Sequence, residues 1–185
     1  MPFQFKNPLK RLCLALLLVS LAGGNRAMAA SEVVTGSVRY EQVTPELYRG
    51  PQPTDVELNQ LAAQGVKTII DLRFGNRHSK EERMSAKSLG LNYIHIPLGY
   101  FIPSKKKIAR ILSVIRSPLT QPVFVHCRYG EDRTSMVVAI YQISDRGMSR
   151  QDAAQDMEKH NFKSWLIPMS RTVAHFKSSN APVAD

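Results

Sequence analysis

The strongest constraint on the fold is a short apolar segment followed, after a loop, by a helix that is apolar on nearly every side. The segment is Val123–His126, and the helix is expected to start at Thr134 and to end near Gly147. A helix without a polar face has to be buried, which places it in the middle of a domain. A continuous apolar strand is typical of a sheet that is covered on both faces. The loop between them is therefore expected to be held by two buried elements.

Strands and helices alternate along the rest of the chain. The expected strands are Val38–Val43, Leu47–Arg49, Val66–Leu72, Leu91–Ile96 and Val123–His126. Capping boxes predict helix starts at Thr54 and Ser79, and Ser104 is a further cap. Two later helices are expected at Arg150–His160 and Trp165–Lys177, with Trp165 in the core. With 185 residues, this alternation predicts one α/β domain whose mainly parallel central sheet is flanked by helices on both faces.

The first 29 residues predict a secretory signal. A basic start at Lys6–Arg11 is followed by an apolar stretch, Leu12–Ala22, and by the small-x-small pattern of Ala27–Ala29. The apolar stretch is shorter than the roughly 20 residues of a membrane-spanning helix, and an uncleaved anchor is the alternative. The expected location is exported, either periplasmic or secreted, with no stable membrane insertion after cleavage. The predicted organisation is a signal at 1–29, a domain at 30–178 and a flexible tail at 179–185.

Removal of the signal leaves one of the two cysteines, Cys127. Exported proteins usually pair their cysteines, so a single one is either buried and inert or kept for its thiol. The net charge of +10 falls to +6 without the four basic residues of the signal. Met84–Gly130 holds seven basic and no acidic residues, so the basicity is concentrated in one segment. Nucleic-acid binding would need basic residues spread with aromatics over a face, and it is therefore not expected.

The loop from His126 to Thr134 carries the chemistry. A tight loop between a strand and a helix points backbone N–H groups inward, and the helix dipole adds positive charge, which together form a cradle for a phosphate dianion. Arg133 can bind two phosphate oxygens. Cys127 opens the loop, so its sulfur is expected at the base of the cradle, where the positive field stabilises a thiolate. Attack by this thiolate would give a phosphocysteine that water cleaves, and Thr134 could hydrogen-bond the departing sulfur.

A His-Cys pair, five residues, Arg and then Thr resembles the signature of the cysteine-dependent protein tyrosine phosphatases. The chain is similar to the dual-specificity branch, especially its small exported bacterial members. The resemblance also includes Leu47–Pro53 and Val66–Arg73, and it covers about Tyr40–Phe176. It implies no metal, no cofactor, and catalytic roles for Cys127, Arg133, Asp132 and Thr134. The residues expected to bind substrate, or in the case of His126 to orient the loop, are His126, Arg128, Tyr129, Gly130, Glu131, Lys105 and Lys106.

The family usually supplies the leaving-group proton from an Asp on a mobile loop, and that Asp is missing here. The corresponding loop is Pro97–Pro103, which contains no Asp or Glu. General acid catalysis contributes about 10²–10⁴-fold, so its loss would leave a weak enzyme. Asp132 is the first candidate for the acid, and accepting backbone N–H groups to stabilise the loop is its alternative role. Glu131, His95 and water are the other candidates.

Three further residues bear on the geometry of the site. Ser135 stands where the family usually has Gly, which narrows the space at the start of the helix. Asp71 and Arg73 lie at the end of a predicted strand. They are expected to form a structural ion pair rather than to act in catalysis.

The basic cluster Lys105–Lys107 bears on the substrate. A helix N-terminus disfavours cations, so the cluster is expected to attract an acidic phosphopeptide, a phosphoinositide headgroup or an inositol phosphate; a solvated surface is the alternative. Tyr100, Phe101 and Tyr129 are suited to flank a phosphotyrosine ring. The predicted function is a phosphomonoesterase acting on phosphotyrosine, phosphoserine or phosphothreonine proteins or on a phosphoinositide-like polyanion. The alternatives are a pseudophosphatase that binds phospho-ligands, and sulfur transfer.

Overall fold

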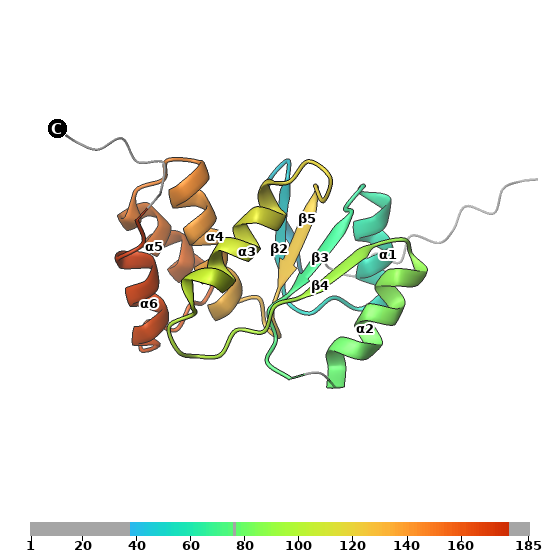
Figure 1. Cartoon of the computed structure of the whole chain (residues 1–185), viewed down its shortest axis with the longest axis horizontal. Helices are drawn as coiled ribbons and strands as arrows, with labels where there is room; N and C mark the ends of the chain where they lie inside the picture. The colour runs from blue at the N-terminus through green and yellow to red at the C-terminus, as the bar shows by residue number, and fades with distance from the viewer. Residues whose placement is uncertain (1–37, 76, 178–185) are drawn as a thin grey trace, which may run out of the picture. The chain divides into compact units, whose positions relative to one another are not determined.

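The computed structural model describes residues 38–75 and 77–177, which are organised around one sheet (Figure 1). Its strands are β1 (Glu41–Thr44), β2 (Leu47–Gly50), β3 (Thr68–Asp71), β4 (Asn92–His95) and β5 (Val123–His126). The strand order is β1-β2-β5-β3-β4, in which β1 is antiparallel to β2 and all other neighbours run parallel. The mainly parallel sheet expected from the sequence is confirmed, and β5 has a parallel partner on each side.

Helices cover both faces of the sheet, as expected. They are α1 (Asp55–Ala63), α2 (Arg77–Ser88), α3 (Lys105–Arg116), α4 (Asp132–Asp145), α5 (Arg150–Lys159) and α6 (Ile167–Ala174). In Figure 1, α1 and α2 lie on one side of the sheet and α3–α6 on the other. Alternate residues of a strand point to opposite faces. Accordingly, Phe124 of β5 packs in the cluster that contains Leu58 of α1, whereas Val125 packs with Ile111 of α3 and Met136 of α4.

The helix α4 is buried on all sides, as its composition predicts. Residues Asp132–Tyr141 are buried without interruption, and the helix begins at Asp132, two residues before the expected start at Thr134. The signal predicted at 1–29 and the tail predicted at 179–185 both lie outside the residues that the structure describes. Within 38–75 and 77–177, no helix is long and apolar enough to cross a membrane.

Local helix signals were correct at Thr54 and wrong at Ser79. Thr54 caps α1: its hydroxyl accepts from the N–H of Glu57, whose carboxylate accepts from the N–H of Thr54. Ser79 lies inside α2, which begins at Arg77. Its hydroxyl does not cap the helix but donates to Oδ2 of Asp71 at 2.6 Å. The expectation that Trp165 is buried is also wrong, since this side chain is 71% exposed in the turn between α5 and α6.

A buried ion pair ties the end of β3 to its neighbours, as expected for Asp71 and Arg73. Arg73 donates from Nε to Oδ1 of Asp71 and from Nη2 to Oδ2, both at 2.9 Å. Ser79 and Tyr93 donate to the same Oδ2 at 2.6 Å. Burial alone would raise the pKa of Asp71, but the bonds from Arg73, the charge of His126 and the two hydroxyls outweigh it and hold this pKa well below its ordinary value.

Asp71→Asn is expected to lower the free energy of unfolding at neutral pH by about 3 kcal/mol, because the buried guanidinium of Arg73 loses its two-bond carboxylate partner and keeps only the contact with Glu82. The folded-state pKa of Asp71 is depressed, so its contribution is present above the unfolded pKa and is lost as the pH falls through the folded value. The variant should therefore lose less stability than the wild type between about pH 4 and pH 2 in denaturant titrations.

The control for this prediction is Asp145→Asn, which breaks the more exposed ion pair with Arg116. Surface pairs contribute little, so the control should cost no more than about 1 kcal/mol. Equal losses in the two variants at neutral pH would contradict the assignment of the Asp71 pair as a buried structural centre.

Candidate active site

The loop that follows β5 packs against the turn that follows β2. The N–H of Gln52 donates to the carbonyl oxygen of Arg128 at 3.2 Å. Gly130 has a φ of 75°, and a Cβ at this position would lie 2.6 Å from the carbonyl carbon of Gly50. The positive φ and the close approach both require glycine. Gly130, expected among the substrate-binding residues, thus has a packing role that alone explains its presence.

Cys127 lies at the start of this loop as a free and buried thiol. Arg133 and Thr134, in the first turn of α4, are buried as well. Neither Nε of Arg133 nor the hydroxyl of Thr134 has a hydrogen-bond partner among the described residues. Buried polar groups are normally paired, so these two groups are suited to bind a ligand in the cradle. The guanidinium carbon of Arg133 lies 5.3 Å from the centre of the Tyr100 ring, which brings the β4–α3 loop to the cradle.

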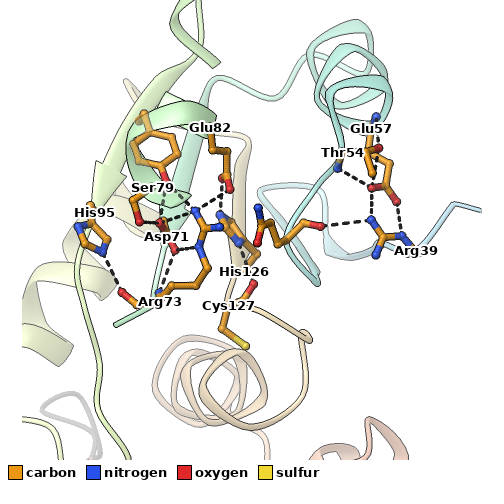
Figure 2. Close-up of polar contacts among 12 residues, drawn as sticks. Arg39, Thr54, Glu57, Asp71, Arg73, Ser79, Glu82, His95, His126 and Cys127 are labelled. Atoms are coloured by element: carbon orange, nitrogen blue, oxygen red, sulfur yellow. Dashed lines mark hydrogen bonds and ion pairs between the residues drawn. The ribbon is translucent and has the colours of Figure 1, made fainter. Parts of the chain in front are cut away.

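His126 connects Cys127 to buried charges. Its Nδ1 lies 3.0 Å from the carbonyl oxygen of Cys127, and its Nε2 lies 2.7 Å from Oε1 of Glu82 in α2. Oε2 of Glu82 lies 2.7 Å from Nη2 of Arg73. Both contacts of Glu82 are ion pairs whose atoms do not meet the geometry of a hydrogen bond, so they act through charge. Figure 2 shows these contacts, with the Cys127 sulfur pointing away from them.

This environment supports an orienting role for His126 rather than contact with a substrate. The ring is fully buried and stacks on Phe124, with ring centres 5.5 Å apart. One nitrogen faces a carbonyl oxygen of the loop and the other faces a carboxylate of α2. The ring therefore positions the start of the loop from behind.

The carboxylate of Asp132 is held by Lys163, from the turn after α5. The N–H of Lys163 donates to Oδ1 of Asp132 at 3.0 Å, and its Nζ lies 3.6 Å from Oδ2. Nζ also donates to Glu131, and this bond raises the pKa of Lys163. The role of loop-stabilising acceptor, foreseen as the alternative for Asp132, is thus present in the structure. His95, a further acid candidate, instead has its Nε2 2.8 Å from the carbonyl oxygen of Arg73.

Arg49 in β2 is a buried cation near the cradle that no motif singles out. Nη2 donates to the hydroxyl of Ser135 at 2.5 Å and Nη1 to Oδ2 of Asp156 at 3.1 Å. Burial lowers the pKa of Arg49, opposed by the negative charges of Asp156 and Glu41. Ser135, which stands where the family usually has Gly, therefore serves as the acceptor for a buried guanidinium. An arginine within a short apolar strand is the only sequence signal that could have indicated this role.

The remaining predicted residues lie at the surface. Arg128 and Tyr129 are exposed, with the guanidinium carbon 5.5 Å from the ring centre. Together with Glu131 they border a hollow of about 840 Å³. Lys105 and Lys106 are exposed at the start of α3 and line neither this hollow nor a second one of about 440 Å³. Residues 38–75 and 77–177 contain no group of three or more His, Cys, Asp or Glu side chains placed to hold a metal.

Comparison with solved structures supports the fold around this site. The structure of Pseudomonas aeruginosa TpbA is 20% identical, covers 76% of this chain and 86% of its own, and has a TM-score of 0.66. The core catalytic domain of the PP-IP phosphatase SIW14 from S. cerevisiae, solved with citrate, is 16% identical, with coverages of 77% and 87% and a TM-score of 0.69.

Sequence comparison identifies the family. The dual specificity protein phosphatase TpbA of P. aeruginosa strain UCBPP-PA14 is 25% identical over 141 residues, which are 74% of this chain. The chain spans 61% of the length of that relative. A family model described as "DSP-PTPase phosphatase fused to NAD+ Kinase" matches residues 26–174. The predicted resemblance is confirmed, and the chain belongs to this family of DSP-PTPase phosphatases.

Proposed function

We propose that this chain is a cysteine-dependent phosphomonoesterase. The observation that carries the proposal is the buried thiol of Cys127 at the junction of β5 and α4, beside Arg133 and Thr134, whose free polar atoms suit a phosphate. The matched family is a family of phosphatases, and TpbA is named a dual specificity protein phosphatase. A binding module without turnover is not favoured, because these relatives are named as enzymes.

The proposed reaction has two displacements at phosphorus. The Cys127 thiolate attacks opposite the leaving oxygen, so that an S–P bond forms as the O–P bond breaks and the leaving oxygen takes a proton. Water then attacks phosphorus, the S–P bond breaks with its electron pair returning to sulfur, and phosphate is released. Arg133 and the N–H groups of the loop bind the phosphoryl oxygens in both steps. The hydroxyl of Thr134 donates to the sulfur as it leaves.

Asp132 is the proposed donor of the leaving-group proton. The N–H of Lys163 fixes Oδ1, while Oδ2 has only the 3.6 Å contact with Nζ among the described residues, so no hydrogen bond within the protein occupies it. Glu131 is less suited, because its carboxylate accepts from Nζ of Lys163. His95 is less suited because its Nε2 faces the carbonyl of Arg73.

A charged His126 is proposed to support the thiolate. The buried cluster behind the loop holds two carboxylates, Asp71 and Glu82, but only one guanidinium, that of Arg73. Nδ1 of His126 faces a carbonyl oxygen, which can only accept, and Nε2 lies 2.7 Å from a carboxylate oxygen, whose charge favours a positive ring, so the proposal puts a proton on each ring nitrogen. The resulting imidazolium balances the cluster and places a fixed positive charge beside Cys127. Glu82 is thereby a positioning residue that keeps His126 charged.

The proposed substrates are phosphorylated proteins or phosphoinositide-like polyanions. TpbA is named a dual specificity protein phosphatase, and SIW14 is named a PP-IP phosphatase. Both names support a phosphorylated substrate for this chain. The exposed Lys105 and Lys106 are consistent with recruitment of a polyanion. The pattern of residues 1–29 supports an exported, periplasmic or secreted location as part of the same proposal.

Cys127→Ser is expected to abolish hydrolysis of p-nitrophenyl phosphate, a phosphotyrosine peptide and a phosphoinositide panel, because serine is not ionised at neutral pH. Phosphate release measures each activity, and vanadate binding reports whether the cradle is intact. A wild-type chain that binds vanadate without hydrolysing any of these substrates would instead support the binding module.

Asp132→Asn is expected to lower kcat on the phosphotyrosine peptide about 10²-fold, because the leaving oxygen loses its proton donor. The loss should be smaller on p-nitrophenyl phosphate, whose leaving group departs without a proton. The fall in rate at alkaline pH should also disappear. Glu131→Gln is the matched control and should retain this alkaline fall. If Asp132→Asn hydrolyses the phosphotyrosine peptide as fast as the wild type, Asp132 is not the proton donor and acts only as an acceptor for the N–H of Lys163.

Glu82→Gln is expected to slow alkylation of Cys127 by iodoacetamide at pH 6 about tenfold, equivalent to about 1.4 kcal/mol of lost thiolate stabilisation. The control is Glu81→Gln, an exposed neighbour in α2. Nitrogen chemical shifts of the His126 ring should show a doubly protonated ring in the wild type and its loss in Glu82→Gln. Equal alkylation rates in the two variants would rule out the positioning role.

A further inference from the structure

Two apolar segments beside the cradle are displayed to solvent. In the β4–α3 loop, Tyr100, Phe101 and Ile102 are exposed, Phe101 by 82% and Ile102 by 65%. Trp165, in the turn before α6, is 71% exposed, and Ile167, the first residue of α6, is half exposed. We call these five residues the apolar rim. Large apolar side chains gathered at one place on a surface mark an interaction site more often than scattered ones do.

Contacts on each side bring both segments to the same loop. Tyr100 lies over the guanidinium of Arg133. Lys163, two residues before Trp165, binds the carboxylate of Asp132 through its N–H. Figure 1 shows the β4–α3 connection at the same end of the sheet as the β5–α4 loop. The two segments that carry the apolar rim therefore meet the loop from its two sides, through Tyr100 and through Lys163.

Buried anchors hold the two segments in place. Leu98 precedes the first segment and is almost fully buried, and Nζ of Lys107 donates to the carbonyl of Pro97 at the base of the same loop. Leu166 stands between Trp165 and Ile167 and is buried in the core. The exposed side chains are thus presented by anchored backbone.

Unpaired cations lie next to the apolar rim. Lys105 and Lys106 begin α3 directly after the β4–α3 loop, are exposed, and have no acidic partner among the described residues. The dipole at the start of a helix disfavours cations, so these lysines do not stabilise α3. Apolar and aromatic side chains beside lysines form the combination that inserts at the surface of an anionic bilayer.

We propose that the apolar rim and Lys105–Lys106 dock the mouth of the cradle onto a bilayer that contains anionic lipids. This rests on the proposed phosphatase function and names where that site meets its substrate, a phosphate monoester presented at a lipid surface. The apolar rim is less well matched to a phosphopeptide, because its residues line no groove that could receive peptide side chains. Both hollows near the loop are lined by other residues, and none of the five members of the apolar rim contributes to either.

The chain carries its own probe for this docking, because Trp165 is its single tryptophan. Vesicles of phosphatidylcholine alone and of equal parts phosphatidylcholine and phosphatidylglycerol are added to the full chain. The emission of Trp165 should shift to shorter wavelength with the anionic vesicles and stay unchanged with the neutral ones. The shift should weaken with added salt. This measurement needs no catalysis, so it stands apart from the test of the phosphatase.

Variants assign the binding to the apolar rim and the lysines. In co-sedimentation with the anionic vesicles, Ile102→Ser should bind more weakly than the wild type, and each of Lys105→Glu and Lys106→Glu should weaken binding at least about fivefold. The matched controls are Leu119→Ser and Lys67→Glu. Leu119 is 88% exposed in the connection from α3 to β5, and Lys67 precedes β3, so both lie at the other end of the sheet. Both controls should bind as the wild type does.

Three results would overturn the proposal. The first is no shift of Trp165 emission with anionic vesicles. The second is binding that survives the Ile102 and lysine substitutions, which would assign it to the apolar stretch Leu12–Ala22. The third combines two measurements: the wild type does not bind vesicles, and Ile102→Ser loses turnover of the phosphopeptide. This result would show that the apolar rim binds a peptide substrate instead of a bilayer.

Discussion

Burial of α4 directly after the central strand β5 is the constraint on which the site depends. Both elements are closed in by helices and strands, so neither can move without opening the core. The loop between them has fixed ends, and the contact of Gly130 with Gly50 presses it from outside. Its N–H groups are therefore oriented before a ligand arrives. A preorganised cradle binds phosphate without the entropic cost of ordering a loop, and it needs no reorganisation in the transition state.

Buried charge reaches this loop from both faces of the sheet. On the side of α1 and α2, Glu82 and Arg73 surround His126, whose Nδ1 faces the carbonyl of Cys127. On the side of α4 and α5, Arg49 of β2 donates to the hydroxyl of Ser135 in α4 and to the carboxylate of Asp156 in α5. Both arginines are themselves held by carboxylates, Arg73 by Asp71 and Glu82 and Arg49 by Asp156. Removing one partner of the fully buried Arg73 pairs costs about 3–5 kcal/mol, because it leaves a buried charge without compensation.

The order of strands and helices and the position of the reactive loop could be predicted from patterns within short stretches of sequence. The side-chain contacts that hold the loop from neighbouring elements could not. The apolar run of β5, the composition of α4 and the capping box at Thr54 each report on their immediate neighbours, and each prediction was confirmed. At Ser79 the same kind of pattern was misleading, because Asp71, from another element, binds the hydroxyl. The bond between Arg49 and Ser135 joins residues 86 positions apart. Such pairs are set by strand order and helix packing, which no local pattern contains.

The missing loop acid and the exposed apolar side chains have a common physical explanation in the proposed docking. A carboxylate among Tyr100–Ile102 would be repelled by an anionic lipid surface and would lose its hydration on contact with it. An acid inside the cradle avoids both penalties. Asp132 is buried there, and the N–H of Lys163 fixes its orientation. A proton donor in the cradle, the role proposed for Asp132, would thus leave the loop free to carry apolar residues. In this proposal the missing acid and the exposed apolar residues are one feature: a loop that does not supply the proton meets the lipid surface instead.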